Sequence, residues 1–92
     1  MMDETDLTAT PRLVTKAMLK HDSVRDAELL LLPERVVRLN ASGAAILRLC
    51  DGSRTVWQVV AQLEHDFEAT GLTNDVVEFL QDAHGWGWVV IA

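Results

Sequence analysis

Two short apolar runs separated by a single Pro-Glu pair constrain the fold of this chain more than any other feature. Residues 28–32 end in four consecutive leucines, and Arg35–Leu39 follows as RVVRL. Because proline presets the first central torsion of a tight turn, Pro33-Glu34 predicts that the two runs pair as an antiparallel hairpin. The partly alternating segment 13–21, followed by turn residues at 22–26, predicts a third strand. We therefore expect a three-stranded antiparallel sheet with the leucine-rich strand at its centre.

Helical signals fill the second half of the chain. Asn40 or Ser42 can cap a first helix, which Asp51-Gly52 is expected to stop. A second helix begins with the capping box Thr55–Gln58 and ends before Gly71. Behind the capping box, apolar residues recur at helical spacing and predict one buried stripe: Val56, Val59, Val60, Leu63 and Phe67.

A third helix is expected to begin at Thr73 or Asn74 and to end at the glycines at 85 and 87. Its buried stripe is Val76, Val77, Leu80 and Ala83, with Phe79 on the flank. The apolar tail 88–91 is expected to bury itself against the sheet. Strands followed by helices predict an α+β, winged-helix-like fold: a single domain over residues 11–92, preceded by a disordered arm over residues 1–10.

Composition excludes several classes of protein. The chain has 92 residues, 14 of them acidic against eight Lys and Arg, and a net charge of −6. A single cysteine excludes an intramolecular disulfide. No apolar run approaches the roughly 20 residues of a membrane helix, and residues 1–10 lack the apolar stretch of a secretory signal. We therefore expect a cytoplasmic protein without a membrane partner.

Residues able to carry catalysis or hold a metal are scattered. The three histidines and Cys50 include no Cys-x-x-Cys pair and no two histidines within one helical turn. The glycines form no phosphate-binding loop. Cys50 lies in an apolar segment, which favours a buried structural thiol over a nucleophile. We expect no catalytic residues, no metal and no cofactor, so the chain is not predicted to be an enzyme.

A winged-helix DNA-binding regulator is the alternative function, because the second and third helices could form a helix-turn-helix. However, residues 55–92 contain no Lys or Arg and six carboxylates. Asp75 and Glu78 fall at the start of the helix that would enter the DNA. Since phosphate contacts need cations, the charge pattern predicts no nucleic-acid partner.

The strand Arg35–Leu39 is expected to lie at an edge of the sheet, next to the helical half. An edge strand exposes unpaired main-chain groups, so a peptide could add to it and place side chains in a groove walled by the third helix. Four arginines (Arg35, Arg38, Arg48 and Arg54) against Asp51 alone give residues 35–54 a charge of +3. These arginines either protect the edge from aggregation or orient a peptide that carries carboxylates.

The sequence resembles the PqqD family from about Pro11 to Val90. The resemblance is carried by the leucine-rich strand with Pro33-Glu34 and by the following segments: Arg38-Leu39-Asn40, Leu49-Cys50-Asp51-Gly52, Arg54-Thr55-Val56, Phe79-Leu80 and Gly85-Trp86. Two positions depart from the family pattern. Arg35 stands where the family often has Gly, and Gly43 stands where Ala is common, which is expected to weaken the start of the first helix by up to about 1 kcal/mol.

The resemblance implies a non-catalytic peptide chaperone of pyrroloquinoline quinone biosynthesis. Family members bind the precursor peptide PqqA beside the third strand and third helix, and present it to the radical S-adenosylmethionine enzyme PqqE. Carried onto this chain, the peptide-contacting residues are Arg35, Val36, Val37, Arg38, Leu39, Asp75, Val76, Phe79, Leu80 and Ala83.

Other surfaces are open to partners as well. The free edge could also pair with itself, so we expect at most a weak or domain-swapped homodimer. Carboxylates on the last two helices offer one surface for the enzyme partner: Glu64, Glu68, Glu78 and Asp82. Trp57, Trp86 and Trp88 could either close the core or contact a partner.

Overall fold

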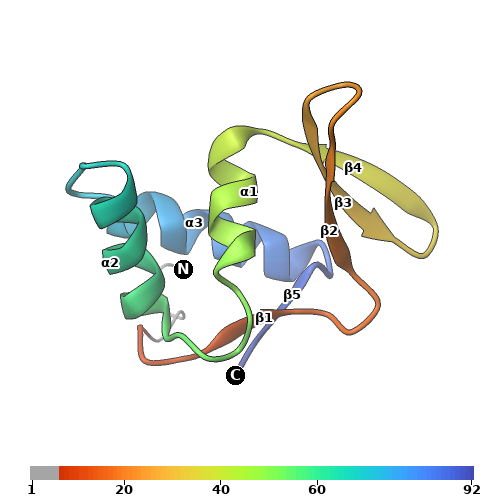
Figure 1. Cartoon of the computed structure of the whole chain (residues 1–92). Coiled ribbons are helices and arrows are strands. Elements are labelled where there is room, and N and C mark those ends of the chain that lie inside the picture. Colours follow the sequence, from red (N-terminus) through yellow and green to blue (C-terminus); the bar gives the residue numbers. More distant parts are fainter. Residues whose placement is uncertain (1–6) are drawn as a thin grey trace.

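A three-stranded antiparallel sheet forms one side of the molecule in the computed structural model, which describes residues 7–92 (Figure 1). Its strands are β2 (Met18–Asp22), β3 (Ala27–Leu32) and β4 (Arg35–Leu39), in the order β2-β3-β4. Leu30 of β3 lies opposite Leu19 on one side and Val37 on the other. The predicted sheet, with the leucine-rich strand at its centre, is confirmed.

The single strand predicted over residues 13–21 is wrong, because the chain turns within it. Residues 14–17 form a turn in which the Ala17 N–H donates to the Val14 carbonyl at 3.0 Å. The part before the turn is β1 (Pro11–Leu13), which pairs antiparallel with β5 (Val89–Ile91) in a separate two-stranded sheet. The apolar tail therefore gains main-chain partners from the start of the chain, in addition to its burial.

Residues 7–10 also differ from the expected disordered arm. The carbonyls of Leu7 and Ala9 accept hydrogen bonds from the N–H groups of Trp57 and Val56, and Thr10 N–H donates to the Ala92 carbonyl. Leu7 packs against the core. The remainder of the expected arm, residues 1–6, lies outside the described part of the chain.

The first two helices begin where their caps predict. Asn40 caps α1 (Ala41–Arg48) by accepting from the Gly43 N–H at 2.7 Å. The capping box of α2 (Val56–Asp66) is complete: the Gln58 N–H donates to the Thr55 hydroxyl, and the Gln58 side chain accepts from the Thr55 N–H. α3 (Thr73–Gly85) has no side-chain cap.

Phe67 is the exception to the predicted stripe of α2. The helix ends at Asp66, so Phe67 takes the C-cap position and its side chain is 58% exposed. The other four stripe residues are buried: Val56, Val59, Val60 and Leu63. All four predicted stripe residues of α3 are buried too: Val76, Val77, Leu80 and Ala83.

Two adjoining apolar clusters make the core. One lies among the three helices and includes Cys50. Burial, together with the nearby Asp51 charge, raises the pKa of the Cys50 thiol to about 12. The other joins Leu30 of the sheet to Ala83 of α3 and to Trp88. The thiol is therefore structural, as predicted, and α3 is fixed against the inner face of the sheet.

Candidate functional site

The outer side of β4 is a free strand edge. β4 pairs with β3 on one side, and within residues 7–92 no strand pairs with it on the other. Main-chain groups on that side are therefore available to an extended peptide. The predicted position of the binding strand at an edge of the sheet is confirmed, while peptide contact with its residues stays a prediction.

The register shows which main-chain groups face outward. A two-residue turn joins β3 to β4, so Leu32 and Arg35 form the hydrogen-bonded pair that closes the hairpin. Hydrogen-bonded and non-hydrogen-bonded pairs alternate along an antiparallel ladder. Val37 and Leu39 therefore direct their main-chain groups toward β3, whereas those of Val36 and Arg38 point to the free edge.

The same alternation sorts the β4 side chains between the two faces of the sheet. Val37 and Leu39 are partly buried and pack in the cluster that contains Ala83 of α3. Val36, 61% exposed, and Arg38 lie on the opposite face, which none of the three described helices covers (Figure 1). Arg35 is exposed within β4 without positive φ, so the position needs no glycine.

The predicted contact residues on α3 fall into two groups. Leu80 and Ala83 are completely buried and Val76 is 2% exposed, so these side chains hold α3 in the core. Asp75 is exposed and Phe79 is partly buried. Only the last two therefore present substantial side-chain surface to a ligand.

Phe79 connects the edge strand with the helices. It packs against the cluster that contains Val37 and Leu39 and also against the cluster among the helices. A Cβ at Gly43 would lie 3.3 Å from the Phe79 ring and 3.0 Å from the Asn40 side-chain oxygen. Gly43, noted in the sequence as a weak helix former, thus gives the ring room beside the cap of α1.

A hollow lies beyond each end of β4. The helix hollow, about 600 Å³, lies between α1, α2 and α3 and begins at Ala41, two residues after Leu39. The turn hollow, about 440 Å³, surrounds Pro33 and Arg35 and reaches Trp86 just after α3. The turn hollow includes Arg35 of β4, whereas the helix hollow begins two residues beyond the strand. Neither was predicted from the sequence, because each combines residues distant along the chain.

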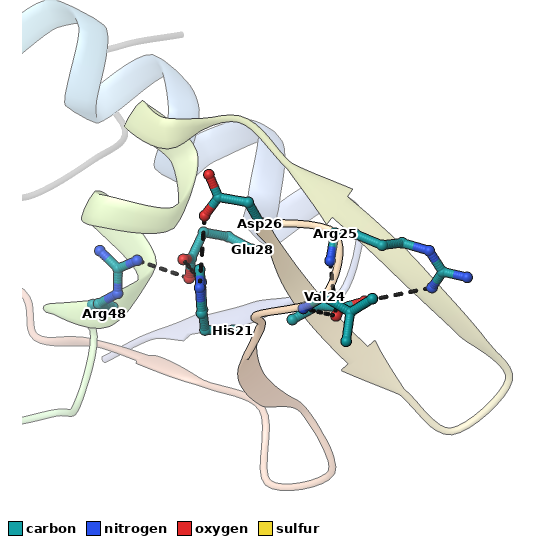
Figure 2. A network of polar contacts seen from close by, with 7 residues as sticks. His21, Val24, Arg25, Asp26, Glu28 and Arg48 are labelled. Atoms are coloured by element: carbon teal, nitrogen blue, oxygen red, sulfur yellow. Dashed lines mark hydrogen bonds and ion pairs between the residues drawn. The ribbon is translucent and has the colours of Figure 1, made fainter.

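A polar network fixes α1 to the sheet on the β2 side. Figure 2 shows Glu28 of β3 between His21 and Arg48, and the Arg48 guanidinium donates to it at 2.8 Å. Two hydrogen bonds lower the pKa of Glu28: the one from His21 contributes most, and the one from Arg48 contributes next. No local pattern along the chain predicts this pairing between strand and helix.

These contacts divide the arginines that the sequence analysis grouped together. Arg48 pairs with Glu28, and Arg54 pairs with Asp51 at 3.1 Å. For Arg35 and Arg38 the structure shows no ion pair within residues 7–92. Two arginines rather than four are thus free of acidic partners beside the edge.

Other candidate residues have ordinary positions. Trp57 is 61% exposed on α2, whereas Trp88 is buried and contacts the exposed Trp86 with ring centroids 4.6 Å apart. Residues 7–92 contain no group of three potential metal ligands. None of the helices described is long and apolar enough to cross a bilayer.

Comparison with known proteins identifies the class of protein. The family described as coenzyme PQQ synthesis protein D (PqqD) matches residues 28–89. This range includes all three helices and, from the sheet, β4 and β3 from Glu28 onward. The chain belongs to this family. The resemblance drawn from the sequence is confirmed.

Individual relatives agree with that assignment. A PqqA binding protein of Azotobacter vinelandii is 38% identical over 89 residues, covering 96% of this chain and 97% of the relative. One from Klebsiella pneumoniae (strain 342) is 42% identical over 72 residues, covering 77% of this chain and 78% of the relative.

A solved structure shares the fold. The solution structure of the PqqD part of Methylobacterium extorquens PqqCD is 28% identical, with a TM-score of 0.78 and 94% of each chain covered. It is described as a functional, stand-alone recognition element for ribosomally synthesised and post-translationally modified peptides. The α+β fold with its sheet and three helices is therefore confirmed, while the likeness to a winged helix stays a prediction.

Proposed function

We propose that this protein is a non-catalytic peptide chaperone that binds the PqqA precursor by strand addition to β4. The observation that carries the proposal is the free β4 edge in a domain whose relatives are named PqqA binding proteins. An extended peptide would pair with the outward main-chain groups of Val36 and Arg38. Its side chains would alternate between the outer face of the sheet and a groove on the inner side, between the edge of β4 and Phe79 of α3.

Main-chain pairing alone is too weak to hold the peptide. Val36 and Arg38 offer two donors and two acceptors, and each new hydrogen bond contributes about 1 kcal/mol net. Association costs on the order of 4–15 kcal/mol in lost freedom. Burial of peptide side chains must therefore supply most of the affinity, and the groove and hollows beside β4 are the places where it can occur.

Presentation to the radical S-adenosylmethionine enzyme PqqE is the second part of the proposal. A chaperone that fixes the register of the peptide determines which side chains reach the enzyme and raises the local concentration of the precursor.

Cys50, the only thiol, is buried with a raised pKa, which agrees with a binding role rather than a catalytic one.

Titration of the isotope-labelled protein with synthetic Azotobacter vinelandii PqqA tests the binding step. We expect saturable changes in amide chemical shifts along β4 and in the α3 segment around Phe79. PqqE is then added to the complex to test presentation: the peptide-induced shifts should persist while the resonances broaden. Absence of binding, or changes confined to residues remote from β4, would contradict the proposal.

A further inference from the structure

The two hollows at the ends of β4 differ in charge. β4 runs from the turn hollow at Arg35 toward the helix hollow beyond Leu39. α3 runs the opposite way, since residues between Asp75 and Asp82 line the helix hollow and Trp86, just after the helix, lines the turn hollow. A peptide added to β4 would therefore have one end beside each hollow.

The helix hollow is apolar within and acidic at its rim. Ile46, Leu72 and Phe79 are among its apolar walls, and three carboxylates of α3 line it: Asp75, Glu78 and Asp82. A carboxylate in the first turn of a helix also interacts with the helix dipole, which accounts for Asp75 but not for the other two. Neither Glu78 nor Asp82 has an ion pair within residues 7–92.

The turn hollow has the opposite character. Lys16 and Arg35 line it together with one carboxylate, Glu34, and with the exposed Trp86. Its lining therefore carries one net positive charge, against three negative charges around the helix hollow. The charge of the lining thus changes sign from one end of β4 to the other, although the protein as a whole has a net charge of −6.

We propose that this groove selects a peptide with a matching order of charges. The peptide segment beside Arg35, at the turn hollow, carries a glutamate or aspartate. The segment beside the helix hollow carries a large apolar side chain next to a lysine or arginine. This inference rests on the proposed function, which it deepens by naming the chemistry of the substrate. The apolar side chain enters the helix hollow, and its neighbouring cation faces Glu78 and Asp82.

The dimensions suit a short segment. Five residues of β4 extend about 17 Å, and thirteen residues of α3 extend about 20 Å, so the two walls of the groove have similar lengths. A strand of five or six peptide residues fills this length. With about two further residues at each end, which reach the two hollows, the occupant is a segment of about ten residues.

A designed ten-residue peptide tests the charge order directly. It carries two glutamates at one end, alternating threonine and valine in the middle, and leucine followed by lysine at the other end. A nitroxide is attached beside the glutamates, and Azotobacter vinelandii PqqA is titrated in parallel. We expect the nitroxide to broaden the resonances of Trp86 and Gly87 more strongly than those of Leu72 and Asp75, which line the helix hollow at the other end of α3.

Charge reversal in the protein provides the second arm. K16E/R35E should weaken PqqA binding at least about fivefold, since two attractions become repulsions. K20E/R25E, which changes the net charge equally on the β2 hairpin, should alter affinity less than twofold. Circular dichroism checks that both double variants are folded, and if K16E/R35E is not, R35E alone is used.

The outcomes separate the two proposals. Stronger broadening around Leu72 and Asp75, equal broadening at both ends, or a designed peptide that fails to bind while PqqA binds would overturn the charge order and leave the chaperone proposal intact. Equal effects of the two charge reversals would overturn it too. If neither peptide binds, the proposed function itself fails.

Discussion

The sheet has two outer strands, β2 and β4, and the comparison between them shows what makes an edge useful. Both expose main-chain groups: the register directs those of Leu19 and His21 outward on β2, as it does those of Val36 and Arg38 on β4. Unpaired main chain is therefore common to both edges and does not by itself define a binding site.

The surroundings of the two strands differ. Beside β2, His21 binds Glu28, which also holds Arg48 of α1, so polar side chains there connect the sheet to the helix (Figure 2). Beside β4, the inner side chains pack with Phe79, and a hollow borders each end of the strand. The β2 side thus stabilises the fold, and the β4 side is available for binding.

Proline at an outward position of β4 should have the largest effect on binding. Val36→Pro or Arg38→Pro removes a donor that faces the peptide, which should weaken PqqA binding about 10- to 100-fold because a peptide carbonyl is left unpaired. His21→Pro removes an outward donor at the edge of β2 together with the side-chain contact to Glu28, and it should leave the affinity of the folded variant unchanged. Isothermal calorimetry on variants shown to be folded decides; equal losses at both edges would remove the distinction.

Proline at the neighbouring inward position should act on stability instead. Val37→Pro removes a donor directed toward Leu30 of β3, and we expect it to lower the free energy of unfolding by about 1–3 kcal/mol. Arg38→Pro should cost less, because its N–H has no partner in the free protein. Urea unfolding of the two variants measures the difference; equal destabilisation would contradict the register assigned to the edge.

Gly43→Ala should produce a smaller change that reaches the binding groove. The added Cβ crowds the Phe79 ring and the Asn40 cap, which offsets the gain of about 1 kcal/mol in helix propensity. We expect a net stability change below about 1 kcal/mol. PqqA affinity should fall severalfold, with shifted Phe79 ring resonances. Gly85→Ala, where a Cβ meets open space, is the matched control; if the two variants bind alike, Phe79 does not depend on Gly43.

Acid titration should affect the β2 side rather than the β4 edge, and it should have the smallest effect. Glu28 has a folded-state pKa below its ordinary value of 4.5, so its stabilising contribution is complete above that pH and is lost as pH falls through the lower value. Glu28→Gln should therefore flatten the dependence of unfolding free energy on pH below about 4.5 while PqqA affinity at pH 7 stays unchanged. An unaltered pH slope, or a large loss of affinity, would contradict the division between the two edges.

Local sequence patterns predicted the elements that local forces determine. The Pro33-Glu34 turn placed β3 beside β4, the Thr55–Gln58 capping box fixed the start of α2, and apolar spacing identified the buried face of α3. Phe67 escaped prediction because a helical stripe does not reveal that the helix ends one residue earlier.

Features that join distant parts of the chain could not be predicted in this way. β1 and β5 pair across nearly the whole sequence, and both segments are only three residues long, too short for alternation to reveal them. The partnership of Arg48 with Glu28 likewise depends on the docking of α1 against the sheet. The helix hollow depends on the packing of the three helices, and the turn hollow on segments 14–16, 32–35 and 86–88, so the sequence predicted the edge but not the pockets at its ends.

Amide hydrogen exchange with and without PqqA tests the central claim most directly. The amides of Val37 and Leu39, directed toward β3, should exchange slowly in the free protein, whereas those of Val36 and Arg38 should exchange fast and become protected only when PqqA is bound. Leu19 and His21 should remain unprotected throughout. Protection of Leu19 and His21 by the peptide, or continued fast exchange of Val36 and Arg38 at saturation, would contradict strand addition to β4.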